Sequence, residues 1–204
     1  MITIVDYGLG NIRAFSNVYE RLNIKTVIAR KADDLRSATK IILPGVGSFD
    51  HAMNLLNNSG MRDELDALVL VKRVPVIGIC LGMQIMAKSS DEGKLAGLNW
   101  FDAEVKLFDS NSIIFKTRYP HMGWNTIEAT KFSPILMNLP NDSKFYFLHS
   151  YYFDCKDPAD VLTRTTYGIT YPSAINKGNI FGIQFHPEKS HSNGVQLLKN
   201  YALL

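Results

Sequence analysis

The chain has 204 residues, 46% of them hydrophobic and 20% charged, and its formal net charge at neutral pH is +3. This composition is typical of a globular protein with a sizeable core. The small charge, without a dense run of lysine or arginine, disfavours nucleic acid as a partner. No apolar run approaches the roughly 20 residues that a membrane-spanning helix needs. With no export signal at the N-terminus and only two cysteines, Cys80 and Cys155, we expect free thiols in a reducing cytoplasm.

Short apolar segments alternate with helical patterns in the first half of the chain. Buried strands are expected at residues 2–5, 26–29 and 41–43, and in the run that leads to Cys80. Helices are expected after two cap candidates, Asn11 and Asp33, and at about 50–57 and 61–71. This alternation predicts a mainly parallel sheet with right-handed crossovers.

The pattern changes after Gly97, where short strand candidates are separated by turn signals. They lie at residues 105–108, 112–115, 124–127, 144–148 and 161–165. We expect antiparallel strands that pack on the first sheet or extend it, followed by a buried strand at 182–185 and a final helix at 194–204. No repeat or linker divides the chain, so a single domain over residues 1–204 is predicted.

Cys80 stands in the motif GICLGMQ (78–84), between an apolar strand and a helix-compatible run. This is the pattern of a nucleophile elbow, in which a sharp turn presents a reactive side chain. Gly78 and Gly82 leave room for the turn, and a cysteine at a helix start faces the positive end of its dipole, which favours thiolate. A buried structural cysteine remains the alternative from this stretch alone.

His186 is the best base for such a nucleophile among the five histidines. It follows a buried strand in the motif GIQFHPEKS (182–190), and catalytic groups of parallel sheets gather at the carboxyl ends of strands. Pro187 restricts its backbone, and Glu188 can accept its second ring N–H. The alternative is a loop histidine beside a solvated glutamate.

Acyl chemistry on a thiolate also needs donors for an oxyanion. The backbone N–H of Leu81 is one candidate. The other is the backbone of Gly45, Val46 and Gly47 in the motif PGVGSF (44–49), which could equally be an ordinary turn.

Taken together, these three motifs resemble the class I glutamine amidotransferases. Two further stretches, PHMGWN (120–125) and HSYY (149–152), together with DYGLGN (6–11), resemble one branch of that family, the glutaminase subunits of imidazole glycerol phosphate synthase in histidine biosynthesis. The resemblance spans the chain in the family's order. It implies a three-layer, flavodoxin-like α/β fold with a mainly parallel central sheet and an added antiparallel portion.

The resemblance also implies a reaction and the residues that perform it. Cys80 would attack the side-chain amide of glutamine to form a thioester and release ammonia, with His186 moving protons and Glu188 orienting His186. Water would then release glutamate, and no cofactor or metal is expected. The family pattern assigns the oxyanion hole to Val46, Gly47 and Leu81. It assigns glutamine binding to Gly45, Gln84, Glu92, His149, Ser150 and Tyr151.

The family members of this branch pass ammonia to a partner, a (βα)8-barrel cyclase, which implies a heterodimer. The interface positions of the family fall on Asn11, Met122, Trp124 and Lys189, although Trp124 could equally be a core residue. Such glutaminases are weak alone, so we expect one oxyanion donor to be misoriented in the free chain.

One segment, residues 108–119, is longer than the histidine-pathway pattern. Related glutaminases supply ammonia to sugar amidotransferases in surface-polysaccharide synthesis, and the triad alone does not distinguish the two pathways. A catalytically silent regulatory subunit is a third possibility, against which the intact Cys80, His186 and Glu188 argue.

Overall fold

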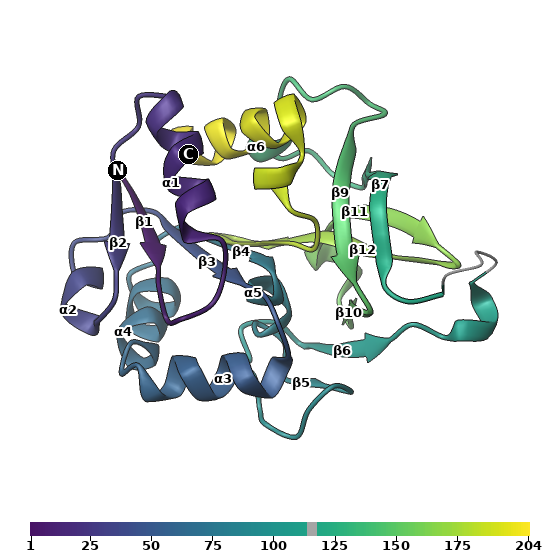
Figure 1. Cartoon of the computed structure of the whole chain (residues 1–204), viewed down its shortest axis with the longest axis horizontal. Coiled ribbons are helices and arrows are strands. Elements are labelled where there is room, and N and C mark those ends of the chain that lie inside the picture. Colours follow the sequence, from purple (N-terminus) through teal and green to yellow (C-terminus); the bar gives the residue numbers. More distant parts are fainter. Residues whose placement is uncertain (114–117) are drawn as a thin grey trace.

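The computed structural model describes residues 1–113 and 118–204 of the protein. At its centre lies an eight-stranded sheet in the order β2-β1-β3-β4-β13-β12-β11-β8 (Figure 1). The first five strands are parallel: β2 (Thr26–Ala29), β1 (Ile2–Val5), β3 (Ile41–Gly45), β4 (Val76–Cys80) and β13 (Ile180–Ile183). The others extend the sheet in antiparallel fashion: β12 (Ile169–Lys177), β11 (Val161–Tyr167) and β8 (Glu128–Ala129).

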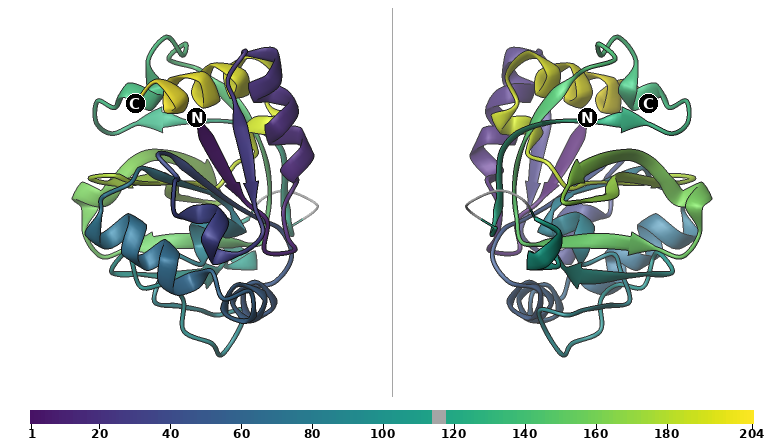
Figure 2. Two further views of the ribbon diagram at one scale, coloured as in Figure 1. Left: turned by 90° about the vertical axis from the view of Figure 1, so that its left-hand side faces the viewer. Right: turned by 90° about the vertical axis from the view of Figure 1, so that its right-hand side faces the viewer.

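Helices cover both faces of this sheet (Figures 1 and 2). One face is covered by α1 (Ile12–Arg21) and α6 (His191–Leu203). The other is covered by α2 (Ala32–Leu35), α3 (Phe49–Asn58) and α4 (Arg62–Asp66), which continues as a π-helical turn, Ala67–Val71. This three-layer arrangement, with an antiparallel extension, confirms the α/β fold class predicted from the sequence.

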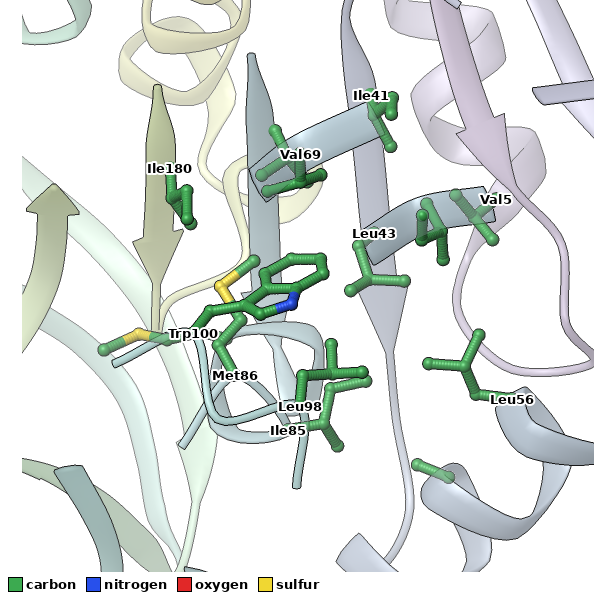
Figure 3. Packing of buried hydrophobic residues seen from close by; sticks show 14 of the residues in the cluster. Val5, Ile41, Leu43, Leu56, Val69, Ile85, Met86, Leu98, Trp100 and Ile180 are labelled. Carbon is green, nitrogen blue, oxygen red and sulfur yellow. The ribbon is translucent and has the colours of Figure 1, made fainter. Parts of the chain in front are cut away.

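Because side chains alternate along each strand, two hydrophobic cores form, one on each face of the central sheet. In β3, Ile42 packs with the residues of α1 and α6, whereas Ile41 and Leu43 point to the opposite face, toward α3 and α4. Figure 3 shows this second core, in which Trp100 lies near Leu43. The indole N–H of Trp100 also donates to the carboxylate of Asp66 (2.7 Å). Each fully buried aliphatic side chain stabilises the fold by about 1.5–3 kcal/mol.

Two smaller sheets complete the second half of the chain. One joins β10 (Tyr151–Cys155), β6 (Ala103–Leu107) and β5 (Ser89–Ser90), and the other pairs β7 (His121–Thr126) with β9 (Lys144–His149). The sequence pattern did not predict β10 or β12. Only Ser150 separates β10 from β9, and β12 contains Pro172, which lacks the N–H that a ladder uses.

Several predicted boundaries were wrong. Asp33 does not cap α2; Lys31 holds that position, and the carboxylate of Asp34 accepts the N–H groups of Arg30 (2.9 Å) and Lys31 (3.3 Å). Asn11 does precede α1, but its side chain makes no capping hydrogen bond.

The helix after Cys80, α5 (Leu81–Gln84), has a single turn, so it supplies less of a dipole than expected. Strand β13 ends at Ile183, two residues before the end predicted from the sequence. The strand predicted at 112–115 begins in a 3-10 turn, Ser110–Ser112, and its last two residues lie outside the described residues. Within residues 1–113 and 118–204, no helix is long and apolar enough to span a membrane.

Candidate active site

Three neighbouring strand ends bring the predicted residues together. In the parallel pairing of β3 and β4, Gly45 lies opposite Cys80, and β13, on the other side of β4, leads to His186 three residues beyond its end. A cavity of about 290 Å³ opens at this edge. Its lining includes ten of the predicted catalytic, oxyanion and substrate residues: Val46, Gly47, Cys80, Leu81, Gln84, Glu92, His149, Ser150, Tyr151 and His186.

Cys80 occupies a strained turn at the end of β4. Its backbone φ is +55° and ψ is −111°, a conformation that non-glycine residues rarely adopt and that clusters at active sites. A side chain at Gly82 would overlap the carbonyl of Leu43, and one at Gly78 would overlap the carbonyl of Gly82. The two glycines are therefore needed for the close packing of the turn, as the motif predicts.

His186 and Glu188 form a buried pair beside the sulfur. The Nδ1 atom of His186 lies 3.0 Å from Oε1 of Glu188, and both side chains are almost fully buried. Burial by itself lowers the pKa of His186, but the hydrogen bonds and negative charges of Cys80 and Glu188 outweigh it and raise the pKa to about 10. Cys80 and Glu188 therefore favour the imidazolium form of His186.

The backbone at the end of β3 faces the same cavity. Val46 is 43% exposed, and Gly47 has a φ of +102° with no atom near its vacant side-chain position. Gly45, by contrast, is not among the lining residues; a side chain there would press on the backbone of Gly82 and the hydroxyl of Tyr7. Gly45 thus permits close packing beneath the site.

The predicted substrate residues differ in which atoms remain available. Gln84 donates both amide hydrogens from Nε2, to the carbonyl of Tyr151 (3.0 Å) and to Oε1 of Gln184 (3.0 Å). Glu92 accepts the N–H of Phe49 at Oε2 (2.8 Å), which leaves Oε1 for another partner. Both side chains are therefore held in place by the fold itself.

Both ring nitrogens of His149 are already engaged. Nδ1 donates to the carbonyl of Tyr151 (2.7 Å), and Nε2 lies 3.1 Å from the hydroxyl of Tyr171. Burial, and next the nearby His121, lower the pKa of His149 to about 3, so the ring is neutral. His149 therefore builds the wall of the cavity rather than presenting a free donor.

Three further residues of the site were not assigned by the sequence analysis. Leu148 and Pro120 line the cavity, and Gln184 contacts Sγ of Cys80 at 3.7 Å from behind it. Gln184 lies inside the motif that carries His186, so its position was a usable signal. Pro120 likewise begins the motif PHMGWN, whereas Leu148 lies in no motif and reaches the cavity only through the pairing of β7 with β9.

A surface patch of Met122, Trp124 and Lys189 adjoins the cavity, because Lys189 also lines it. Met122 is 61% exposed and Trp124 47% exposed, so the alternative of a core tryptophan was wrong. The Trp124 ring stacks on His191 with centroids 5.1 Å apart, and Nζ of Lys189 lies 5.8 Å from the centre of the Tyr146 ring. Asn11 is exposed at the start of α1.

The fold and this site define a class of protein. The model of the family described as glutamine amidotransferase class-I matches residues 3–203, and the chain belongs to this family. A solved structure described as a glutamine amidotransferase shares the fold, with a TM-score of 0.75, 20% identity and coverage of 98% of both chains.

Relatives within the family are much closer in sequence. The imidazole glycerol phosphate synthase subunit HisH of Bdellovibrio bacteriovorus is 52% identical over 202 residues, which are 99% of each chain. The subunit of the same name from Leptospira interrogans is 49% identical over the full length of both chains. The imidazole glycerol phosphate synthase subunit HisH 2 of Pseudomonas aeruginosa is 43% identical, again over the full length of both chains.

Proposed function

We propose that the chain is the glutaminase subunit of an imidazole glycerol phosphate synthase, which hydrolyses glutamine and delivers the ammonia to a cyclase partner in histidine biosynthesis. The observation that carries the proposal is the buried His186–Glu188 pair, whose histidine lines the same cavity as the strained Cys80. The relatives support the histidine pathway over a sugar amidotransferase. Those at 40–52% identity match the chain over nearly their whole length, and each is named a subunit of imidazole glycerol phosphate synthase.

The residues at the cavity suit each step of the reaction. The Cys80 thiolate attacks the amide carbon of glutamine, and the backbone N–H groups of Leu81 and the Val46–Gly47 segment stabilise the oxyanion. The His186 imidazolium gives its proton to the leaving nitrogen, which departs as ammonia and leaves a thioester. Neutral His186 then takes a proton from water, the hydroxide releases glutamate, and the thiolate is restored. Glu188 holds His186 in the required orientation throughout.

The side chains around the cavity suit recognition of glutamine. Both amide hydrogens of Gln84 are used within the protein, so its amide oxygen is the atom that would meet the substrate. The free carboxylate oxygen of Glu92 would pair with the α-ammonium group, and Ser150 and Tyr151 would frame the substrate with their backbone, whereas Gly45 would act from beneath the cavity by permitting close packing. His149 would act by holding the carbonyl of Tyr151.

The partner would sit on the patch formed by Met122, Trp124 and Lys189, and the exposed Asn11 would add to the interface. Exposed apolar groups of this size favour a covering surface, and Lys189 joins the patch to the cavity. A sealed interface would keep ammonia from being protonated in water before it reaches the acceptor.

The test is Cys80→Ala in the complex with the cyclase subunit. Glutamine-dependent synthesis should be lost, whereas synthesis from added ammonium salts should continue at the wild-type rate. Cys155→Ala is the matched control and should leave both activities unchanged, because burial raises the pKa of Cys155 to about 12 and keeps it a thiol. Glutamine use that survives Cys80→Ala would overturn the proposal.

A further inference from the structure

Gln184 is a fully buried amide that lies behind Cys80 and has no part in the mechanism above. It follows the end of β13, and its backbone N–H donates to the carbonyl of Ser173 on β12 (2.9 Å). Its side-chain Nε2 lies 3.7 Å from Sγ of Cys80. Gln184 is not among the residues that line the cavity, so this contact reaches the sulfur from the protein interior.

A backbone carbonyl decides which end of the Gln184 amide faces the sulfur. A carbonyl oxygen only accepts hydrogen bonds, so the atom of Gln84 that lies 3.0 Å from the oxygen of Tyr151 is its amide nitrogen. The same nitrogen donates its second hydrogen to Gln184 at 3.0 Å, so Gln184 presents its amide oxygen there. The NH2 end of Gln184 is then the end that faces Cys80.

The carbonyl of Tyr151, which sets the orientation of both amides, is itself held in place. His149 donates to it from Nδ1 (2.7 Å), and the hydroxyl of Tyr171 donates to Nε2 of the same ring (3.1 Å). A neutral histidine with a hydrogen on Nδ1 satisfies both contacts. The orientation of Gln184 is therefore fixed by a set of hydrogen bonds that reaches from β12 through β9 and β10 to α5.

The sulfur of Cys80 also contacts an acceptor. Its thiol can donate to the carbonyl oxygen of Leu148 at 3.9 Å while it carries its proton. Once the proton has left, that carbonyl presents lone pairs to a negative sulfur and disfavours the charge. An N–H group that also contacts the sulfur offsets this effect.

We propose that Gln184 is a catalytic residue, whose side-chain N–H donates to the Cys80 thiolate and keeps the sulfur charged for attack. The assignment rests on the proposed role of Cys80 as nucleophile. His186 supplies the counter-charge at this site, and Gln184 adds a neutral donor that stays in place when His186 hands its proton to the leaving group. The donor is thus present at each stage in which the thiolate exists.

The test measures ionisation of Cys80 without using glutamine. The rate of alkylation by iodoacetamide is followed across pH in the complete chain, on the peptide that contains Cys80, so that Cys155 does not contribute. Gln184→Met preserves the side-chain length and removes the donor, and it should raise the midpoint of alkylation by about one pH unit. Gln84→Met leaves Gln184 in place but frees the amide of Gln184 to rotate. This variant should raise the midpoint of alkylation by a smaller amount. Gln196→Met is the matched control, because this glutamine is hydrogen-bonded to Asn200 on α6, away from the cavity.

Glutaminase turnover gives a second readout. Because Gln184 lies outside the cavity, Gln184→Met should lower kcat about tenfold with KM unchanged, whereas a disturbed cavity would raise KM. The proposal is overturned if the alkylation curve of Gln184→Met superimposes on that of the wild type. If Gln184→Met cannot be purified in folded form, the alkylation midpoint of Gln84→Met is used in the same way. Failure of the proposed function would appear separately, as glutamine hydrolysis that survives Cys80→Ala.

Discussion

The two halves of the structure contribute to the site in different ways. The parallel half places Cys80 and His186 through its backbone, since β3, β4 and β13 are neighbours and end at the same edge. The antiparallel half forms the wall through side-chain hydrogen bonds, with Tyr171 of β12 linking His149 of β9 to His121 of β7. The first arrangement depends on short motifs, and the second on contacts between distant residues.

Two buried histidines, one from each half, differ in whether the imidazole ring is charged. His186 and His149 are both buried, yet the pKa of His186 is raised to about 10 and that of His149 is lowered to about 3. Negative neighbours, Cys80 and Glu188, stabilise the charge on the first ring. The second ring has a carbonyl, a hydroxyl and another neutral histidine around it. The partners of a buried histidine, rather than burial alone, therefore decide its charge.

Removing the carboxylate of the parallel half should have the largest effect. Glu188→Gln takes away a negative charge and the acceptor that holds Nδ1 of His186, so kcat for glutamine hydrolysis should fall about 10³-fold. The pKa of His186, followed by NMR, should fall from about 10 at the same time. A variant with wild-type kcat would show that the pair serves only the fold.

The elbow should be the most sensitive point for stability. Gly82→Ala forces a methyl group against the carbonyl of Leu43, so the free energy of unfolding should fall by about 3 kcal/mol or more. Gly60→Ala is the control: its φ of +70°, unlike the backbone of Gly82, disfavours a side chain, but no atom lies near the new methyl group. It should cost only about 1 kcal/mol. Equal losses in urea denaturation would contradict the role of close packing.

The two kinds of histidine should destabilise the protein at opposite ends of the pH scale. The pKa values of His149 and His121 are lowered to about 3 and 4 in the folded protein. Below pH 6.5 these two histidines therefore bind protons in the unfolded chain but not in the folded chain. Their contribution to stability is complete above pH 6.5 and is lost as the pH falls toward 3.

The raised pKa of His186 acts in the other direction. Its contribution is complete below pH 6.5 and is lost as the pH rises toward 10. Unfolding free energies measured from pH 4 to 10 should therefore peak near neutrality. His149→Gln should flatten the acid side only, and Glu188→Gln the alkaline side only. A change on the wrong side in either variant would break the comparison.

Tyr171→Phe should have the smallest effect. It removes the hydroxyl between two neutral histidines, so we expect a loss of about 1–2 kcal/mol in unfolding free energy. A several-fold rise in KM for glutamine should follow as the cavity wall loosens. Tyr19→Phe is matched, because its buried hydroxyl also donates one hydrogen bond, to the carbonyl of Leu198 (3.1 Å), but far from the cavity. It should lose similar stability with KM unchanged; a KM shift in both would point to a general loss of rigidity.

The sequence by itself predicted which residues the parallel half brings together at the cavity. The elbow glycines, Cys80, His186 and Glu188 lie in contiguous motifs, and the strand–helix alternation places those motifs at one sheet edge. A local pattern suffices there because the backbone alone carries each residue to its position. The alternation likewise predicted the parallel strands, although exact boundaries and the cap of α2 were missed.

Only the tertiary structure decided the rest. The exposure of Trp124, the neutral state of His149 and the orientation of Gln184 follow from contacts between residues far apart in the chain; Gln84 and Gln184 are separated by 100 positions. No sequence period encodes which end of an amide faces a sulfur. Hydrogen-bond direction is set instead by whichever acceptor the fold places within 3 Å, here the carbonyl of Tyr151.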